Sequence, residues 1–191
     1  MSYKIAVYGS AAGDYSMAVA KTRELGEALG KRNCVVITGA CDGLPYAACV
    51  AAAAAGSNIW GFSPATDLAT HQQVCPKQEI ALYSKIFYVP KNFELITNMD
   101  ACRKYRNVIS TATCDAGIIM AGRWGTMNEF TNLYDMGKVI GVLTGTGNIA
   151  DELEGWCKKI SKESKAQIIY NDSPEHLVEQ VIAALQTKKH L

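Results

Sequence analysis

The chain has 191 residues, enough for one sizeable hydrophobic core or a single α/β domain. Hydrophobic residues make up 49% of it and charged residues 19%, a composition that excludes a disordered protein. The net charge is +1 without a basic block, which argues against a nucleic-acid binder driven by phosphate contacts and leaves only a small local patch open.

We expect neither a membrane span nor a signal peptide. No apolar run reaches the length of a membrane span, and the Ala-rich residues 51–55 are short and predict a buried helix. The first residues are predicted to lead directly into a strand, which is not the pattern of a signal peptide. We therefore expect a cytoplasmic protein with neither a membrane nor a nucleic acid as partner.

The seven cysteines form no CxxC pair, and the three histidines are not near one another in sequence. A zinc site therefore has weak support, and we expect no metal site. In a reducing compartment such cysteines are mostly small buried apolar residues. Cys41 and Cys75 are the exceptions, because they fall in predicted loops.

The first half of the chain alternates strands with helices. We predict strands at 4–8, 34–38 and 58–62, and helices at 15–31 and 45–55. Pro45 suits a helix start, where its missing N–H would be unpaired anyway, and Gly56 suits the position after a helix end. The regular β-α-β-α-β spacing predicts a parallel, doubly wound sheet.

Residues 65–85 interrupt this alternation, because they show no clear period. A long loop inside a compact domain is usually functional. We interpret the segment as an insertion over the carboxyl ends of the strands that could serve as a lid.

The second half returns to the alternation. We predict strands at 86–89, 116–120, 139–143 and 167–170, and helices at 97–113, 126–136, 149–161 and 174–186, with Thr97 as an N-cap. The whole pattern predicts an α/β Rossmann-like three-layer sandwich: a doubly wound, mostly parallel sheet of about seven strands with helices on both faces. Without an internal linker, we expect one domain over residues 1–191.

The turn after strand 116–120 carries the strongest functional signal. Gly122 and Gly125 let the backbone approach a ligand, and Thr126 stands where an N-cap belongs. Free N–H groups at a helix start form an anion site, and Glu129 places a carboxylate one turn further on. The pattern suits a ligand with a phosphate and a sugar. Thr126 and Glu129 also have the spacing of a capping box, which has no ligand.

Four glycine loops follow predicted strands, at residues 9–13, 39–43, 122–125 and 145–147. Each alone could be a simple turn, but together they lie at the edge where open α/β sheets bind ligands, which favours a nucleotide or another phosphorylated ligand. The first loop lacks GxGxxG, and no acid follows the second strand to hold a ribose. NAD or NADP chemistry and a P-loop ATPase are therefore disfavoured.

Arg106-Asn107 and the run AGRWGTMNE at residues 121–129 resemble the signature of the Lonely Guy (LOG) family, an Arg on a helix followed by PGGxGTxxE. The resemblance covers nearly the whole chain, including the loop at 39–43 and the strand and turn at 59–64. Arg106-Asn107 in place of Arg-Lys, together with residues 144–151, is closer to the LOG-like branch that includes molybdenum cofactor carrier proteins.

The resemblance implies a Rossmann-like fold, a homodimer or higher homo-oligomer, and phosphoribohydrolase activity. Such enzymes cut the N-glycosidic bond of a nucleoside 5′-monophosphate, which releases the base and ribose 5-phosphate. By position, Arg106 and Glu129 match the catalytic pair. Residues expected to bind the ligand or its phosphate are Gly9, Ser10, Gly39, Gly43, Gly122, Arg123, Gly125 and Thr126. We expect that no cofactor is required and that molybdenum cofactor is a candidate bound ligand.

The chain departs from the family pattern at two places. Ala121-Gly122-Arg123 replaces Pro-Gly-Gly, which puts a cationic side chain where a backbone usually approaches phosphate, and Asn128 replaces an acid common in the enzymes. Two functions therefore stay open: a phosphoribohydrolase, or a non-catalytic carrier or sensor of a nucleotide-like ligand. Whether Trp124 stacks on a ligand or packs against a helix also stays open. Without the resemblance, Arg106 is better interpreted as a surface helix residue in a basic cluster with Arg103 and Lys104.

Overall fold

The computed structural model describes residues 2–11, 15–76, 78–160 and 162–188. The predicted end of the first glycine loop at residues 12 and 13 and the predicted helix end at residue 161 lie outside this part of the chain.

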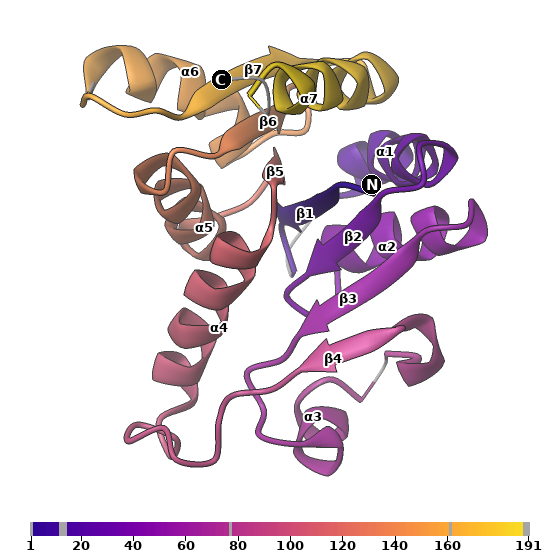
Figure 1. Cartoon of the computed structure of the whole chain (residues 1–191), viewed down its shortest axis with the longest axis vertical. Coiled ribbons are helices and arrows are strands. Elements are labelled where there is room, and N and C mark those ends of the chain that lie inside the picture. The colour runs from indigo at the N-terminus through magenta and orange to yellow at the C-terminus, as the bar shows by residue number, and fades with distance from the viewer. Residues whose placement is uncertain (1, 12–14, 77, 161, 189–191) are drawn as a thin grey trace.

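A seven-stranded parallel sheet forms the centre of the fold, in the order β4-β3-β2-β1-β5-β6-β7 (Figure 1). Its strands are β1 (Lys4–Gly9), β2 (Val35–Thr38), β3 (Asn58–Phe62), β4 (Lys85–Phe87), β5 (Ala116–Met120), β6 (Val139–Leu143) and β7 (Gln167–Asn171). β5 and β6 are buried along their whole length, which explains their unbroken apolar runs.

Helices cover both faces of this sheet. They are α1 (Val19–Lys31), α2 (Leu44–Ala54), α3 (Leu68–Val74), α4 (Met99–Thr113), α5 (Trp124–Asp135), α6 (Ile149–Lys159) and α7 (Pro174–Lys188), with short 3-10 helices η1 (Ser16–Ala18) and η2 (Ile80–Leu82). α1, α2 and α7 pack on one face, and α4, α5 and α6 on the other (Figure 1). The predicted three-layer α/β fold is therefore confirmed.

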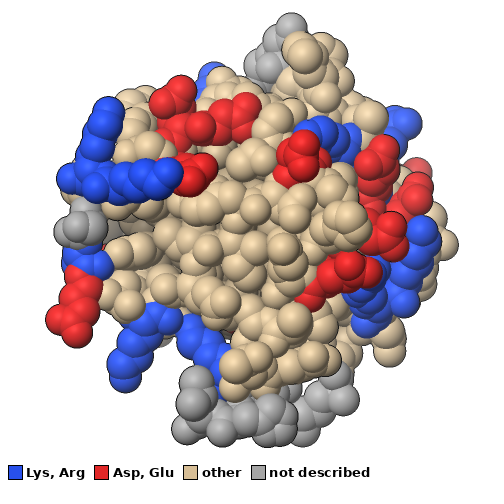
Figure 2. All heavy atoms as spheres, turned by 90° about the horizontal axis from the view of Figure 1, so that it is seen from above, with Lys and Arg blue, Asp and Glu red and all other residues tan. Residues whose placement is uncertain are grey.

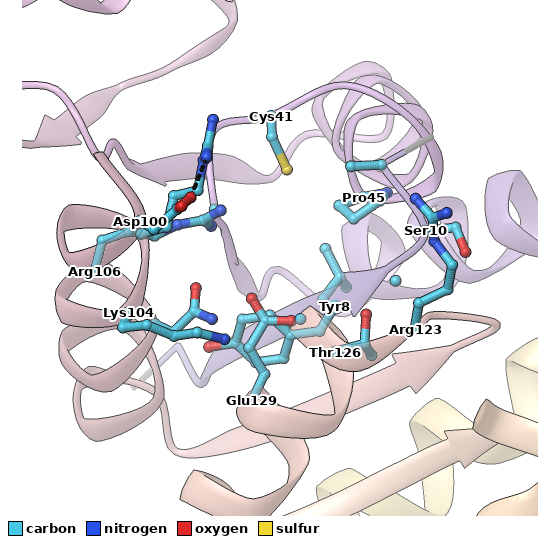
Figure 3. Close-up of a pocket in the computed structure, with 17 residues that line it drawn as sticks. Tyr8, Ser10, Cys41, Pro45, Asp100, Lys104, Arg106, Arg123, Thr126 and Glu129 are labelled. Atoms are coloured by element: carbon cyan, nitrogen blue, oxygen red, sulfur yellow. Dashed lines mark hydrogen bonds and ion pairs between the residues drawn. The ribbon is translucent and has the colours of Figure 1, made fainter. Parts of the chain in front are cut away.

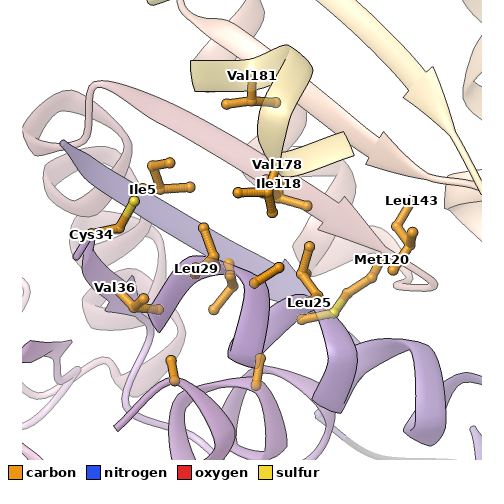
Figure 4. Close-up of a cluster of buried hydrophobic side chains, with 14 of the residues drawn as sticks. Ile5, Leu25, Leu29, Cys34, Val36, Ile118, Met120, Leu143, Val178 and Val181 are labelled. Atoms are coloured by element: carbon orange, nitrogen blue, oxygen red, sulfur yellow. The ribbon is translucent and has the colours of Figure 1, made fainter. Parts of the chain in front are cut away.

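A hydrophobic core fills each space between helices and sheet. The core under α1 and α7 includes Ile5, Leu25, Leu29, Ile118 and Val178, all fully buried (Figure 4). Each such side chain contributes about 1.5–3 kcal/mol by leaving water. The two cores hold β1 and β5 firmly, and the loops at the carboxyl ends of these strands are thus built on a rigid base.

The strand order reverses beside β1. β2, β3 and β4 extend the sheet on one side of it, while β5, β6 and β7 extend it on the other. The connections after β1 and β5 consequently diverge, and open α/β sheets bind ligands in the crevice that such a reversal opens at the carboxyl ends.

Residues 65–85 are not the unstructured loop expected from the sequence. They contain α3 and η2, and α3 lies beside the β4 edge of the sheet (Figure 1). The Asp67 side chain caps α3 by accepting from the Thr70 N–H at 2.9 Å, but seven residues are too few to show a helical period. The predicted N-cap at Thr97 is also wrong, because the Asn98 side chain caps α4.

The surface above α6 and α7 mixes acidic and basic side chains around an uncharged centre (Figure 2). Among the described residues, no helix combines the length and apolarity needed to span a membrane.

Candidate functional site

A cavity of about 310 Å³ lies at the reversal of strand order, between α4, the start of α5 and the loops after β1 and β2 (Figure 3). The following residues line it: Val7, Tyr8, Gly9, Ser10, Ala11, Gly39, Cys41, Pro45, Asp100, Arg103, Lys104, Arg106, Asn107, Arg123, Gly125, Thr126 and Glu129. Of the five charged lining side chains contributed by α4 and by the start of α5, four are cationic. The fifth, Asp100, forms an ion pair with Arg103 at 2.7 Å. The rim therefore suits an anionic ligand.

Glu129 lies at the inner end of this cavity, on the second turn of α5, and is only 7% exposed. Neither of its carboxylate oxygens has a hydrogen-bond or ion-pair partner within the described part of the chain. Burial raises the pKa of Glu129 to about 7, although Arg106 and Lys104 favour the charged form. Near neutral pH the group is therefore present both as acid and as base.

Arg106 approaches the cavity from α4 and lies directly over Gly39. A Cβ at Gly39 would stand 1.3 Å from Arg106 Nη1, so only glycine leaves room for the guanidinium. Arg106 Nε is buried without a hydrogen-bond partner among the described residues. Gly39 thus positions the arginine, and the unpaired N–H is available to a ligand.

The N-terminus of α5 differs from the prediction. The helix begins at Trp124 with Arg123 as N-cap, and no side chain caps it, so both the predicted Thr126 N-cap and the alternative capping box are wrong. Thr126 instead packs on Gly122, whose added Cβ would meet the threonine side chain at 2.5 Å. Gly122 has φ 89°, a conformation that glycine adopts without strain.

Open N–H groups result from this arrangement. The Gly122 N–H donates to Ser10 Oγ at 3.0 Å, but the first N–H groups of a helix have no acceptor within the helix. An added Cβ at Gly125 would meet nothing within 4 Å, so the backbone there is open to a ligand. The positive end of the helix dipole at this point favours a bound anion.

Two amides occupy the positions where the LOG family has charged residues. Asn107 is 4% exposed and donates from Nδ2 to Asn128 Oδ1 at 3.1 Å. Asn107 and Asn128 therefore compensate each other, because a neutral hydrogen bond between them joins α4 to α5. Asn107 Oδ1 is buried without a partner among the described residues and lines the cavity, which leaves one acceptor for a ligand.

Most of the residues expected at the site lie in one place. Gly9, Ser10, Gly39, Arg106, Arg123, Gly125, Thr126 and Glu129 line the cavity. Gly43 and Gly122 do not: Gly43 packs against the backbone of the first loop, and Gly122 borders a neighbouring cavity.

Sequence reasoning gave no role to Tyr8, whose buried hydroxyl donates to Ser110 at 3.0 Å beneath Glu129. Its position in an apolar strand resembles a core residue and gives no separate signal. Lys104 was named only as part of a basic cluster, although it lines the cavity and acts on Glu129. The expected lid is not supported, since no described residue of 65–85 lines the cavity.

The fourth glycine loop is also absent from the cavity wall. Asp151 accepts from the N–H groups of Gly145 at 2.7 Å and Gly147 at 2.9 Å. Thr146 Oγ1 accepts from the Ala121 N–H at 2.8 Å and donates to the Leu143 carbonyl. This loop therefore supports the turn after β5, and the N–H groups of Gly145 and Gly147 are already paired with Asp151.

The cysteines are free, and five of the seven are buried. Cys75, expected in a loop, is buried at the end of α3, where its thiol lies 3.4 Å from the Ala40 carbonyl. Cys41 lines the cavity, and burial raises the pKa of its thiol. Within the described residues, no group of three or more His, Cys, Asp or Glu side chains could hold a metal ion.

The fold and the site define an α/β protein with an anion-binding cavity at the carboxyl ends of its parallel strands. The model of the SLOG cluster4 family matches residues 2–178, and the chain belongs to that family. The resemblance seen in the sequence is therefore confirmed at the level of the superfamily. A search of curated proteins found no match.

Several solved structures share the fold. TM1055 superposes with a TM-score of 0.77 at 19% identity, over 95% of this chain and 99% of the other. The molybdenum cofactor binding protein of Rippkaea orientalis superposes with a TM-score of 0.71 at 16% identity, over 97% of this chain and 98% of the other. DNA processing protein A of Helicobacter pylori superposes with a TM-score of 0.64 at 19% identity, over 97% of this chain and 81% of the other. At these identities the likeness shows the fold alone.

The exclusion of nucleic acid as a partner was wrong. The Helicobacter pylori structure is described by its single-stranded DNA binding mode, so a chain with this fold can bind nucleic acid. Net charge and the lack of a basic block do not decide the matter, because folding gathers Arg103, Lys104, Arg106 and Arg123 from two separate segments around one cavity.

Proposed function

We propose that the chain acts as one nucleotide-binding domain over residues 1–191 and hydrolyses the N-glycosidic bond of a nucleoside 5′-monophosphate. The products are the free base and ribose 5-phosphate. The observation that carries the proposal is the buried Glu129 carboxyl, which lies in the same cavity as the open start of α5 and the Arg106 guanidinium.

The phosphate is assigned to the start of α5. Open N–H groups, the helix dipole and the Arg123 side chain all favour an anion there, and the bare Gly125 lets it come close. The ribose then extends toward Glu129, one turn deeper, where Asn107 Oδ1 and Arg106 Nε offer one acceptor and one donor to its hydroxyls. The base is left beside Cys41, Pro45 and Ala11.

Glu129 carries the chemistry in this proposal. Cleavage of a glycosidic bond passes through an oxocarbenium-like state, which a buried carboxylate stabilises strongly in low dielectric. With a pKa of about 7, Glu129 can also take the proton of the attacking water at neutral pH. Water adds to the anomeric carbon, and the base leaves with a proton.

The test is chromatography after incubation with AMP and a panel of other nucleoside 5′-monophosphates, scored for free base and ribose 5-phosphate. Wild type releases base, and Glu129→Gln loses at least about a thousandfold in turnover while still binding the nucleotide. Glu24→Gln, on the exposed face of α1, is the matched control and keeps full activity. Full turnover by Glu129→Gln would remove Glu129 from the mechanism.

A carrier or sensor of a nucleotide-like ligand, such as molybdenum cofactor, is the second candidate. Arg123 favours it, because this exposed cation lines the cavity in place of the family glycine. The Rippkaea orientalis neighbour, described as a molybdenum cofactor binding protein, also supports it. Thermal-shift binding without base release from any nucleotide, and a pterin released on denaturing the purified protein, would select the carrier.

We also propose that the chain forms a homodimer or higher homo-oligomer and needs no cofactor for hydrolysis. Light scattering coupled to size-exclusion chromatography measures the oligomeric state. Dialysis against a metal chelator tests whether hydrolysis needs a cofactor, and the rate of hydrolysis is expected to be unchanged after it.

A further inference from the structure

A second cavity, of about 480 Å³, adjoins the first across Arg123. Gly122, Arg123 and Trp124 line it from the start of α5, and Asn148, Ile149, Asp151, Glu152 and Trp156 line it from α6. Because Arg123 lines both cavities, the second cavity lies next to the phosphate site of the first.

Trp124 is the unusual residue of this second cavity. It is the first residue of α5 and is 80% exposed, so it does not pack against a helix. A large aromatic side chain this exposed beside a cavity typically marks a binding surface. Trp156, on α6, is partly buried against the hydrophobic core and forms a fixed wall on the other side.

The cavity does not suit a second phosphate. The first N–H groups of α6 are occupied, since Ile149 donates to the Gly122 carbonyl at 3.3 Å and Ala150 to the Ala121 carbonyl at 3.0 Å. The Asp151 carboxylate is bonded to the fourth glycine loop. Among the described lining residues, Arg123 at the boundary is the one cation, while Glu152 adds a carboxylate.

These surfaces match a flat heteroaromatic ring. A base has a π-face that stacks on an exposed tryptophan whatever its identity. An exocyclic amino group on the ring would donate to the Glu152 carboxylate, and the phosphate that carries the ring would stay beside Arg123.

We propose that this second cavity is a subsite for an amino-substituted purine, the second base of a ligand whose two nucleosides are joined by a phosphate bridge. The proposal rests on the proposed function for one point, the placement of the first nucleotide's phosphate at the start of α5. The ligand then runs from Glu129, past Arg123, to the face of Trp124.

Binding of AMP and of diadenosine 5′,5′-diphosphate by the full chain tests this proposal, with calorimetry and tryptophan fluorescence as readouts. Wild type binds the dinucleotide about tenfold more tightly than AMP, and only the dinucleotide quenches Trp124. Trp124→Ala removes the tenfold gain and leaves AMP binding unchanged. Leu95→Ala, at a residue 55% exposed and outside both cavities, changes neither affinity.

The role of Glu152 has its own comparison. Glu152→Ala weakens binding of the dinucleotide severalfold. Replacing adenine by hypoxanthine in the dinucleotide weakens binding to wild type by the same factor, and it causes no further loss of affinity in the variant. Equal affinity of wild type for AMP and dinucleotide, or equal weakening of both by Trp124→Ala, overturns the subsite.

The same measurements separate the subsite from the proposed hydrolase. Dinucleotide binding that quenches Trp124, with no hydrolysis of any monophosphate, contradicts the hydrolase and keeps the subsite. If wild type binds neither AMP nor the dinucleotide, both proposals are contradicted. If Trp124→Ala dissociates an oligomer in sedimentation, Trp124 belongs to a contact between copies and the subsite is overturned.

Discussion

Two glycine loops on neighbouring strands of one sheet edge have opposite roles. The loop at residues 122–125 follows β5, and the loop at 145–147 follows β6. The first leaves Gly125 open to the cavity, with uncapped N–H groups behind it. In the second, Asp151 occupies two amides and Thr146 ties the loop to Ala121.

The difference teaches that glycine alone does not make an anion site. Both loops have the backbone freedom, but a ligand needs donors that the protein has not already paired. The site loop also stands beside Glu129, a buried carboxyl that destabilises the fold when charged, whereas the supporting loop gains hydrogen bonds. Four predictions test this contrast.

Glu129→Gln should have the largest effect on stability. Because the folded-state pKa is about 7 and the ordinary value 4.5, the folded protein holds a proton that the unfolded chain releases. Wild-type stability therefore falls as pH rises from about 4.5 to 7, by up to about 3 kcal/mol, and stays lower above that range. The variant, which cannot ionise, lacks this fall.

Urea unfolding at pH 5 and pH 8 measures this difference. The variant should exceed wild type clearly at pH 8 and little at pH 5, with Glu24→Gln behaving as wild type at both. Parallel pH profiles for all three proteins would mean that Glu129 is not held in a costly environment.

Gly39→Ala tests whether the glycine seats Arg106. The new Cβ would stand 1.3 Å from Arg106 Nη1, so the guanidinium must move away from the cavity. A displacement of about 1 Å in a positioned catalytic group lowers turnover about a hundredfold. Nucleotide hydrolysis, or nucleotide affinity if the protein is a carrier, provides the readout.

Gly155→Ala is the matched control for this substitution. Its Cβ meets nothing within 4 Å in the middle of α6, and alanine favours a helix by about 1 kcal/mol over glycine. Full function of Gly39→Ala would show that Arg106 has no fixed place at the site.

Gly125→Ala and Gly147→Ala compare the two loops directly. At Gly125 the methyl group meets no protein atom, so stability is kept, but it stands where the phosphate approaches and weakens nucleotide binding about tenfold. At Gly147, with φ 82°, alanine is strained by about 1 kcal/mol, and nucleotide affinity stays unchanged. Denaturant unfolding and calorimetry on both variants should give this crossed pattern; the reverse pattern would exchange the roles of the loops.

The sequence was sufficient to predict the layers of the fold, because buried parallel strands are unbroken apolar runs and the glycine turns mark their ends. It also brought Arg106 and Glu129 together through the LOG resemblance. It could not show that Gly39 serves Arg106, or that Asn107 pairs with Asn128, since both contacts join segments far apart in the chain.

Local spacing was misleading where two structures share one pattern. Thr126 and Glu129 have the spacing of a capping box, yet the helix begins two residues earlier and buries both side chains. Likewise, the sequence left Trp124 open between packing and stacking, and only its exposure excludes packing against a helix.

Asp151→Asn should have the smallest effect of the four. The asparagine keeps one carbonyl oxygen for Gly145 or Gly147 and loses the charge that strengthens both bonds, which costs about 1 kcal/mol of stability. The loss of an acid from the first turn of α6 acts in the same direction. AMP affinity should not change, because residues 145–147 do not line the Glu129 cavity. Denaturant unfolding and AMP calorimetry measure the two quantities on one variant. A fall in AMP affinity at unchanged stability would mean that the supporting loop contacts the ligand, and that the contrast between the two loops does not hold.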